Sequence, residues 1–135
     1  MNVVLDTNIV VSGIYFKGAP YYILKAWLEG AFKVYATPAI LAEYFEVIDD
    51  LAHHKKPSFG HDWKMVLPEI CHLVPDEKHK QPISRDASDD KFIYCAQNAK
   101  AQYLVSGDDD LKVLSSQFRL RFQILSPRQF LNTLG

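Results

Sequence analysis

The chain has 135 residues, of which 48% are hydrophobic and 23% are charged, and its formal net charge is −1 at pH 7. This length predicts one domain over residues 1–135, with a core that needs no disulfides, and the composition excludes a disordered chain. The small net charge is unlike that of a dedicated strong DNA binder, which is usually far more basic.

Strands and helices are expected to alternate along the chain, because short apolar runs are separated by stretches with helical spacing. In the first half the expected elements are a strand over Val3–Leu5, a helix over Tyr22–Glu29, a strand over Phe32–Ala36 and a helix from Pro38 through Leu51. Ser12-Gly13 and Gly18-Ala19-Pro20 interrupt the pattern between the first two elements. Thr37 is the predicted N-cap of the helix that begins at Pro38.

The second half is expected to begin with a basic loop over His53–Gly60, which proline and glycine break. After it we expect a helix over Asp62–His72, a strand over Leu73–Pro75, a polar stretch over Asp76–Arg85, a helix over Asp89–Lys100, a strand over Tyr103–Val105, a short helix from Asp109 to near Ser115, a strand over Phe122–Leu125 and a helix over Pro127–Leu134. The alternation predicts an α/β fold with a central parallel sheet and helices on both sides.

Acidic residues follow two of the predicted strands. Asp6 comes directly after the first strand, and Asp108 follows the strand Tyr103–Val105 by way of Ser106-Gly107. Open α/β sheets place their sites beyond the carboxyl ends of parallel strands, where gathered carboxylates repel one another unless a cation lies between them. We therefore predict a divalent-metal site that acts on a phosphate. The alternative for Asp6 is a turn residue at the end of a strand, where aspartate is common.

Helical spacing adds Glu43 and Asp89 to this group. Glu43 borders the apolar stripe of its helix, so it can point along the end of the sheet, although a surface glutamate is the alternative. Asp89 shares a helix face with Ile93 and Ala96, which makes it either a metal ligand or a partner of the helix dipole. Asp90 is expected to point away from that face, towards solvent.

The run from Ser106 to Asp110 is the densest acidic stretch of the chain. Serine and aspartate are favoured at helix N-termini, but three consecutive aspartates exceed what capping requires. Asp108 is predicted to be a ligand and Asp110 a second or outer ligand, whereas Asp109 is expected to be solvated.

These motifs together resemble the PIN domain family over essentially the whole chain, and within it the ribonuclease toxins of VapBC-type toxin–antitoxin pairs. The motifs that carry the resemblance are Val4-Leu5-Asp6-Thr7-Asn8, Glu43, Asp89-Asp90-Lys91-Phe92-Ile93-Tyr94-Cys95-Ala96 and Leu104-Val105-Ser106-Gly107-Asp108-Asp109-Asp110-Leu111. Each motif is short, but their order and spacing together are fairly specific. The resemblance implies a PIN-like, three-layer α/β/α fold of Rossmann-like type.

The resemblance also implies which residues form the site. By analogy with the family, the metal-binding and catalytic acids are Asp6, Glu43, Asp89 and Asp108. Asn8 and Ser106 match the polar residues that orient these acids, and Asp110 matches a frequent additional acid. Asp86 takes the place of Asp89 if its helix begins earlier.

The resemblance implies an activity as well, namely cleavage of single-stranded RNA that depends on Mg²⁺ or Mn²⁺ and leaves a 5′-phosphate on the product. Such ions prefer oxygen ligands, and one or two of them supply an activated water without a histidine or lysine base. Lys17, Arg85, Lys91 and the run His53–Lys56 are candidates for contacts with the RNA backbone, although a solvated loop is the simpler interpretation of that run. The resemblance further implies a cognate antitoxin and a homodimer.

Other functions fit the same residues less well. A PIN-like module that has lost hydrolysis would bind RNA or a protein partner without cutting. A haloacid-dehalogenase-type phosphohydrolase would have a second aspartate where Asn8 stands, and a dinucleotide-binding domain would have a G-x-G-x-x-G motif after the first strand, which the chain lacks. A zinc site is conceivable from Cys71, His72, His53, His54, His61 and His79, but their spacing fits no finger.

The remaining features concern location. Cys71 and Cys95 form no C-x-x-C motif, and Cys95 falls on an apolar helix face, so it is expected in the core. We find no signal peptide and no apolar run long enough to cross a bilayer, which together predict a cytoplasmic protein without a membrane contact.

Overall fold

The computed structural model of the chain describes residues 1–52, 57–76, 90–108, 111 and 121–135. Its centre is a five-stranded parallel sheet with the strand order β3-β2-β1-β4-β5. The strands are β1 (Asn2–Leu5), β2 (Lys33–Ala36), β3 (Cys71–Leu73), β4 (Tyr103–Val105) and β5 (Gln123–Leu125). The predicted α/β fold with a central parallel sheet is confirmed.

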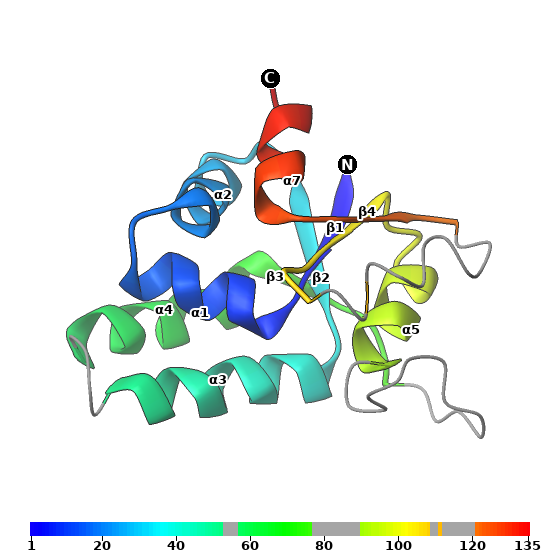
Figure 1. Ribbon diagram of the computed structural model, residues 1–135. Helices are drawn as coiled ribbons and strands as arrows, with labels where there is room; N and C mark the ends of the chain where they lie inside the picture. The colour runs from blue at the N-terminus through cyan, green and yellow to red at the C-terminus, as the bar shows by residue number, and fades with distance from the viewer. Residues whose placement is uncertain (53–56, 77–89, 109–110, 112–120) are drawn as a thin grey trace.

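Helices cover both faces of this sheet. The described helices are α1 (Thr7–Tyr15), α2 (Ala19–Leu28), α3 (Pro38–Ala52), α4 (Pro57–Ile70), α5 (Asp90–Asn98) and α7 (Pro127–Thr133). Helix α5 lies on one side of the strands, in contact with β1, β2 and β4, whereas α1 to α4 lie on the other side (Figure 1). The short helix α7 packs on β4, β5 and α2.

The strand order places a topological switch next to β1. From β1 the chain builds β2 and β3 on one side, then returns to build β4 and β5 on the other. The ends of β1 and β4 are in register, with Leu5 opposite Val105. Residues that follow these two strands therefore meet at the edge where open α/β sheets bind their ligands.

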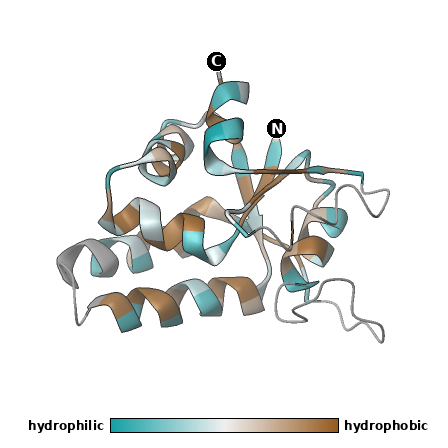
Figure 2. Cartoon of the chain, in the orientation of Figure 1, coloured by the Kyte–Doolittle hydropathy of each residue, from teal (hydrophilic) through white to brown (hydrophobic). Residues whose placement is uncertain are grey.

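The sheet is held by an apolar core that runs through β1. Val3, Val4 and Leu5 are fully buried, as expected for a parallel strand covered on both faces. Hydrophobic residues also line the sides of α1 and α3 that face inward (Figure 2). The prediction that Cys95 belongs to the core is confirmed, because its side chain is fully buried.

Helix α1 is the element that the sequence interpretation missed, because Ser12-Gly13 was taken as an interruption. Gly13 is buried inside α1, where α2 approaches closely. A Cβ atom at this position would lie 2.6 Å from Leu24 Cδ1 and 2.8 Å from the carbonyl oxygen of Pro20. The glycine therefore permits close helix packing instead of ending a helix.

The boundaries around α4 also differ from expectation. Residues 57–60 belong to α4, although a loop was predicted there, so proline stands at the start of the helix, where its missing N–H is tolerated. The predicted helix over Asp62–His72 ends at Ile70, and β3 begins at Cys71 instead of Leu73. Backbone pairing with β2 determines this register, since Val34 lies opposite Cys71.

The remaining expectations agree closely with the structure. Helix α3 begins after Thr37, whose Oγ1 accepts a 3.1 Å hydrogen bond from the N–H of Ile40. Helix α2 begins at Ala19, earlier than predicted, with proline in its first turn. Helix α7 follows a capping box formed by Ser126 and Gln129. Most of the expected polar stretch 76–85 and of the expected helix 109–115 lies outside the described residues.

We predict that Gly13→Ala lowers the free energy of unfolding by about 1–3 kcal/mol, because the added methyl group meets the Pro20 backbone and the Leu24 side chain in a packed interior. Gly107→Ala is the matched control, since a Cβ atom there meets no atom of the described residues within 4 Å. Urea unfolding of both variants measures the difference. Equal stability of the two variants would contradict the packing role assigned to Gly13.

Candidate metal and phosphate site at the carboxyl edge of the sheet

Asp6 occupies the end of β1 and is almost completely buried, with 7% of its surface exposed. It stands at the N-cap position of α1, where the backbone N–H of Asn8 acts on its carboxylate without forming a full capping hydrogen bond. Its Oδ2 atom instead accepts a 2.8 Å hydrogen bond from the hydroxyl of Ser106. The carboxylate is therefore directed towards the neighbouring strand, which a simple turn residue would not require.

Ser106 links the ends of β1 and β4. It is fully buried, and its Oγ atom accepts a 2.9 Å hydrogen bond from the backbone N–H of Asp108 while its own hydroxyl proton goes to Asp6. The backbone N–H of Asp6 donates to the carbonyl of Val105 at 3.0 Å. These bonds hold the start of the Ser106–Asp108 turn beside the carboxylate of Asp6.

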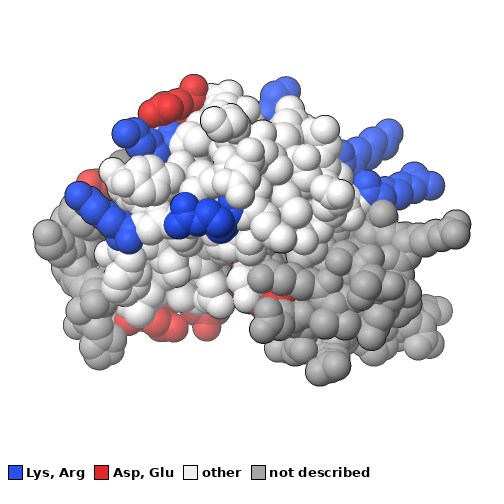
Figure 3. Space-filling view, turned by 45° about the horizontal axis from the view of Figure 1, so that its top comes forward, with Lys and Arg blue, Asp and Glu red and all other residues white. Residues whose placement is uncertain are grey.

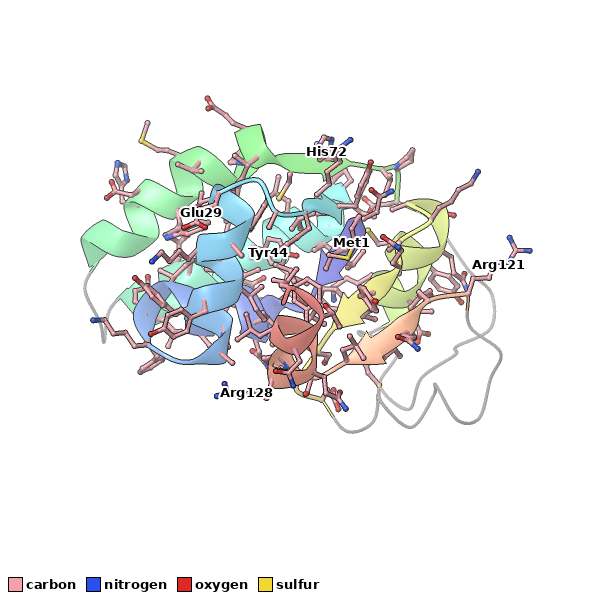
Figure 4. The ribbon with its side chains drawn as sticks, turned by 90° about the horizontal axis from the view of Figure 1, so that it is seen from above. Met1, Glu29, Tyr44, His72, Arg121 and Arg128 are labelled. Atoms are coloured by element: carbon pink, nitrogen blue, oxygen red, sulfur yellow. The ribbon has the colours of Figure 1, made fainter. Side chains whose placement is uncertain are left out.

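Helix α3 brings Glu43 to the same edge. The neighbouring Tyr44 is fully buried, and its hydroxyl donates a 2.6 Å hydrogen bond to the carbonyl of Leu5, the residue before Asp6. Figure 4 shows Tyr44 inside the molecule, between the helices and the strands. Glu43 itself accepts a hydrogen bond from the hydroxyl of Thr7. The tyrosine thus anchors α3 to the end of β1, and Glu43 comes to lie beside the first turn of α1.

Helix α5 contributes a lysine to this edge, and the residue before that lysine is a buried aspartate. The ammonium group of Lys91 forms a 2.7 Å ion pair with Glu43 Oε1. Asp90, the first residue of α5, is only 7% exposed. The prediction that Asp90 points to solvent is therefore wrong. The helical periodicity could not separate Asp89 from Asp90, because nearly every residue of the first turns of α5 is buried, on several faces of the helix.

The electrostatics of Asp6 reflect this convergence. Burial raises the pKa of Asp6 above its ordinary value of 3.8, while the hydrogen bond from Ser106 and the backbone N–H of Asn8 lower it. The negative charges of Glu43 and Asp108 raise it further. The charged groups of Glu43 and Asp108 are thus close enough to act on the carboxylate at the end of β1.

The donor chemistry of this edge fits a hard divalent cation. The side chains that meet here offer carboxylate and hydroxyl oxygens, the ligands that Mg²⁺ and Mn²⁺ prefer. Within the described part of the chain, however, no group of three His, Cys, Asp or Glu side chains is gathered closely enough to hold a metal. Instead, Glu43 is bound to Lys91 and Thr7.

Several predicted site residues lie elsewhere or outside the described residues. Those outside are Asp86, Asp89, Asp110, Arg85 and the run His53–Lys56. Lys17 is exposed in the connection between α1 and α2. Asn8 is exposed in the first turn of α1, and it is its backbone N–H that lowers the pKa of Asp6. The predicted roles of all these residues stay predictions.

Two residues at this edge were not anticipated. Thr7 directly follows Asp6 in the chain, and this adjacency is a sequence signal that could have identified it. Tyr44 follows Glu43 in the chain, and nothing in the sequence indicates its role, because only the partner of its hydroxyl distinguishes it from a buried phenylalanine. Because burial raises the pKa of Tyr44 well above its ordinary value, the hydroxyl stays protonated and remains a donor.

The cysteines are not suited to metal binding or nucleophilic chemistry. Burial raises the pKa of both Cys71 and Cys95 to about 12, so their thiols stay protonated near neutral pH. Both are free thiols. Together with the spacing, this argues against the zinc site that was considered for Cys71.

Fold and site together define an α/β domain with an acidic, oxygen-rich edge at its topological switch. A family model described as "PIN domain" matches residues 2–110. The chain therefore belongs to the PIN domain family. No curated protein matches the chain.

Solved structures share the fold at low sequence identity. One is described as VapBC2 from Rickettsia felis bound to a DNA fragment from their promoter, with 16% identity and a TM-score of 0.61 over 93% of this chain and 98% of the matched chain. FitAB bound to an IR36 DNA fragment has 16% identity and a TM-score of 0.57 over 93% and 94%. The PIN domain endonuclease Utp24 has 16% identity and a TM-score of 0.53 over 93% and 84%.

In the residues that the structure describes, none of the helices combines the length and the apolar character that a membrane span requires.

The raised pKa of Asp6 predicts a pH-dependent stability in metal-free solution. Because the folded protein holds this proton more tightly than the unfolded chain, the free energy of unfolding falls as the pH rises from 3.8 through the raised value. Ionised Asp6 thus destabilises the fold at pH 7, and Asp6→Asn should raise the free energy of unfolding there by roughly 0.5–2 kcal/mol.

Urea unfolding between pH 3.8 and pH 7 in the presence of EDTA measures this effect. The stability difference between Asp6→Asn and the unmodified protein should shrink towards the acidic end. Asp49→Asn is the control, because Asp49 is exposed. An Asp6→Asn variant that is less stable than the unmodified protein at pH 7 would contradict the interpretation.

Proposed function

We propose that this protein is a divalent-metal-dependent endoribonuclease that hydrolyses RNA phosphodiesters and serves as the toxin of a type II toxin–antitoxin pair. The observation that carries the proposal is the meeting of Asp6, Glu43 and Asp108 at the topological switch, where the charges of Glu43 and Asp108 act on the buried carboxylate of Asp6. Membership of the PIN domain family supports the nuclease class.

The proposed metal-binding set consists of Asp6, Glu43, Asp108 and an aspartate at the start of α5. We favour Asp90 for this last position, because the residue is buried although it stands at the N-terminus of a helix. Asp89, which the sequence pattern singled out, lies outside the described residues. Asp110 remains a candidate for an additional ligand.

The chain's own residues have distinct roles in this proposal. Asp6 provides the central ligand, and the hydroxyl of Ser106 fixes the direction of its carboxylate. Thr7 and Tyr44 hold Glu43 and α3 at the end of β1. The chemistry that a bound Mg²⁺ or Mn²⁺ ion supplies is neutralisation of charge at the phosphodiester and activation of a water molecule.

Substrate capture is proposed to depend on a small number of cations. Among the described residues on the face shown in Figure 3, Lys and Arg side chains lie around an uncharged centre and form no continuous basic surface. Lys17, Arg85 and Lys91 are the proposed phosphate contacts, and Lys91 pairs with a site residue, Glu43. Such contacts position the backbone of the RNA without specifying its sequence.

An antitoxin is the proposed protein partner, in a cytoplasmic setting and with a homodimer as the proposed assembly. Structures described as VapBC2 and FitAB, both bound to DNA, share the fold. A hollow of about 310 Å³ lies between α1, α2 and α4, lined mainly by Ile14, Tyr21, Leu24, Leu28 and Trp63. Its apolar lining, with Leu28 56% exposed, suits an apolar segment of an antitoxin.

Aromatic residues of the first two helices and of their connection are further candidates for such an interface. Phe16 and Tyr22 suit it, because they are 50% and 53% exposed. Trp27 is only 5% exposed and belongs to the core. Tyr15 is partly buried and packs against the core, where its hydroxyl donates to the carbonyl of Ile48 at 3.3 Å.

Cleavage of a labelled single-stranded RNA pool with Mn²⁺ tests the activity. We expect Asp6→Asn to lower the cleavage rate by at least about a hundredfold, since metal-derived stabilisation of the transition state amounts to several kcal/mol. EDTA should abolish cleavage by the unmodified protein. Asp49→Asn is the control, because Asp49 lies on α3, the helix that also carries Glu43. This variant should cleave RNA at the rate of the unmodified protein.

Because Asp6→Asn is predicted to be at least as stable as the unmodified protein, its loss of activity could not be ascribed to unfolding. Binding of RNA without any cleavage by the unmodified protein at any Mn²⁺ concentration would favour the alternative of a binding module. Cleavage that survives EDTA would contradict the metal dependence.

The assignment of the fourth carboxylate is tested by comparing Asp90→Asn with Asp89→Asn. Replacing a ligand should weaken Mn²⁺ binding by at least about tenfold, because even residues that only support a ligand have effects of that size. We expect this loss for Asp90→Asn and a much smaller one for Asp89→Asn in isothermal titration calorimetry. The reverse order would restore Asp89 as the ligand.

A further inference from the structure

The contact that the proposed function does not use is the ion pair between Lys91 and Glu43. It joins α5 to α3 at 2.7 Å, and the two side chains are 25% and 30% exposed. Thr7 donates to the second oxygen of the same carboxylate. Both oxygens of Glu43 are thus engaged by groups of this chain, and one of those groups carries a full positive charge.

A lysine in this position opposes the binding of a metal at Glu43. A divalent cation needs a lone pair of the carboxylate that faces the site, and the ammonium group bonds to that carboxylate already. Partial burial makes the pair stronger than one in bulk water, because the surrounding dielectric is lower. The ring of Phe92 lies 5.2 Å from the ammonium group and offers it a second contact.

We propose that Lys91 is a resident counter-cation of the acidic edge, which competes with the divalent metal for Glu43 and is displaced from it when the metal binds. This inference rests on the proposed metal site and adds a control on its affinity. Lysine suits the role because its charge sits on a long flexible stem, so the ammonium group can leave one carboxylate without moving the helix. Lys91 is then a positioning residue for Glu43, and it raises the metal concentration that is needed to fill the site.

The chain offers a matched ion pair away from the site. Lys64 of α4 contacts Asp49 of α3 at 2.8 Å, and its ammonium group lies 5.9 Å from the ring of Phe45. The residue types, the distance and the aromatic neighbour are similar. The pairs differ in exposure, since the side chains of Lys64 and Asp49 are 36% and 56% exposed, and in that Glu43 acts on Asp6.

Mn²⁺ titration of the full chain by isothermal calorimetry tests the competition. Lys91→Met should bind Mn²⁺ roughly three- to tenfold more tightly than the unmodified protein, the size expected when a partly exposed ion pair no longer has to be broken. Lys64→Met should bind Mn²⁺ with the affinity of the unmodified protein. Lys91→Arg should also keep that affinity, because its guanidinium group still competes for Glu43.

A double-mutant cycle separates direct competition from a general effect of charge. In a Glu43→Gln background, Lys91→Met should no longer tighten Mn²⁺ binding, because the carboxylate for which the two cations compete has been removed. The same tightening in both backgrounds would overturn the proposal, since it would show that Lys91 acts only through space. Unchanged affinity of Lys91→Met in the native background would overturn it as well.

A second measurement uses the unmodified protein and does not depend on any variant folding. During a Mg²⁺ titration monitored by NMR of lysine side chains labelled with ¹³C and ¹⁵N, the Lys91 signals should shift with saturation while those of Lys64 stay in place. Constant Lys91 signals at saturating Mg²⁺ would overturn the displacement. If the unmodified protein binds neither cation, the proposed function fails together with this inference, whereas normal binding with unmoved Lys91 signals refutes this inference alone.

Discussion

The hydrogen bond from Ser106 to Asp6 connects the two strand ends on which the whole site depends. It exists because β1 and β4 are adjacent and parallel, so the residues that follow them emerge at one edge. The same serine accepts from the N–H of Asp108, which holds the acidic turn after β4 beside the end of β1. A buried carboxylate would be unfavourable without such partners. The topology thus gathers negative charge, and the serine keeps it in a fixed arrangement.

A second constraint comes from α3. The hydroxyl of Tyr44 bonds to the last carbonyl of β1, and this contact puts Glu43 next to Thr7 at the start of α1. Helix α5 adds Lys91, whose ammonium group pairs with Glu43. Elements far apart in the sequence therefore contribute charges of both signs to one place, as the proposed metal and phosphate site requires.

The sequence predicted those features that depend on local patterns. Apolar runs located β1 and β4, and the polar residues after them located Asp6 and Asp108. Features set by contacts between elements were missed: the close approach at Gly13 concealed α1, and pairing with β2 moved β3 to Cys71. Asp90 was placed in solvent because periodicity cannot rank neighbouring residues when a helix is buried on several faces. The ion pair of Lys91 could not be inferred from spacing, since it joins two helices.

The carboxylates at this edge are proposed to hold a divalent cation. The anomalous scattering of Mn²⁺ in a crystal soaked with the ion measures this directly. We expect a peak with carboxylate oxygens of Asp6 and Asp108 within bonding distance, about 2.0–2.2 Å for small divalent cations. A peak elsewhere on the molecule, or none at this edge at saturating Mn²⁺, would contradict it.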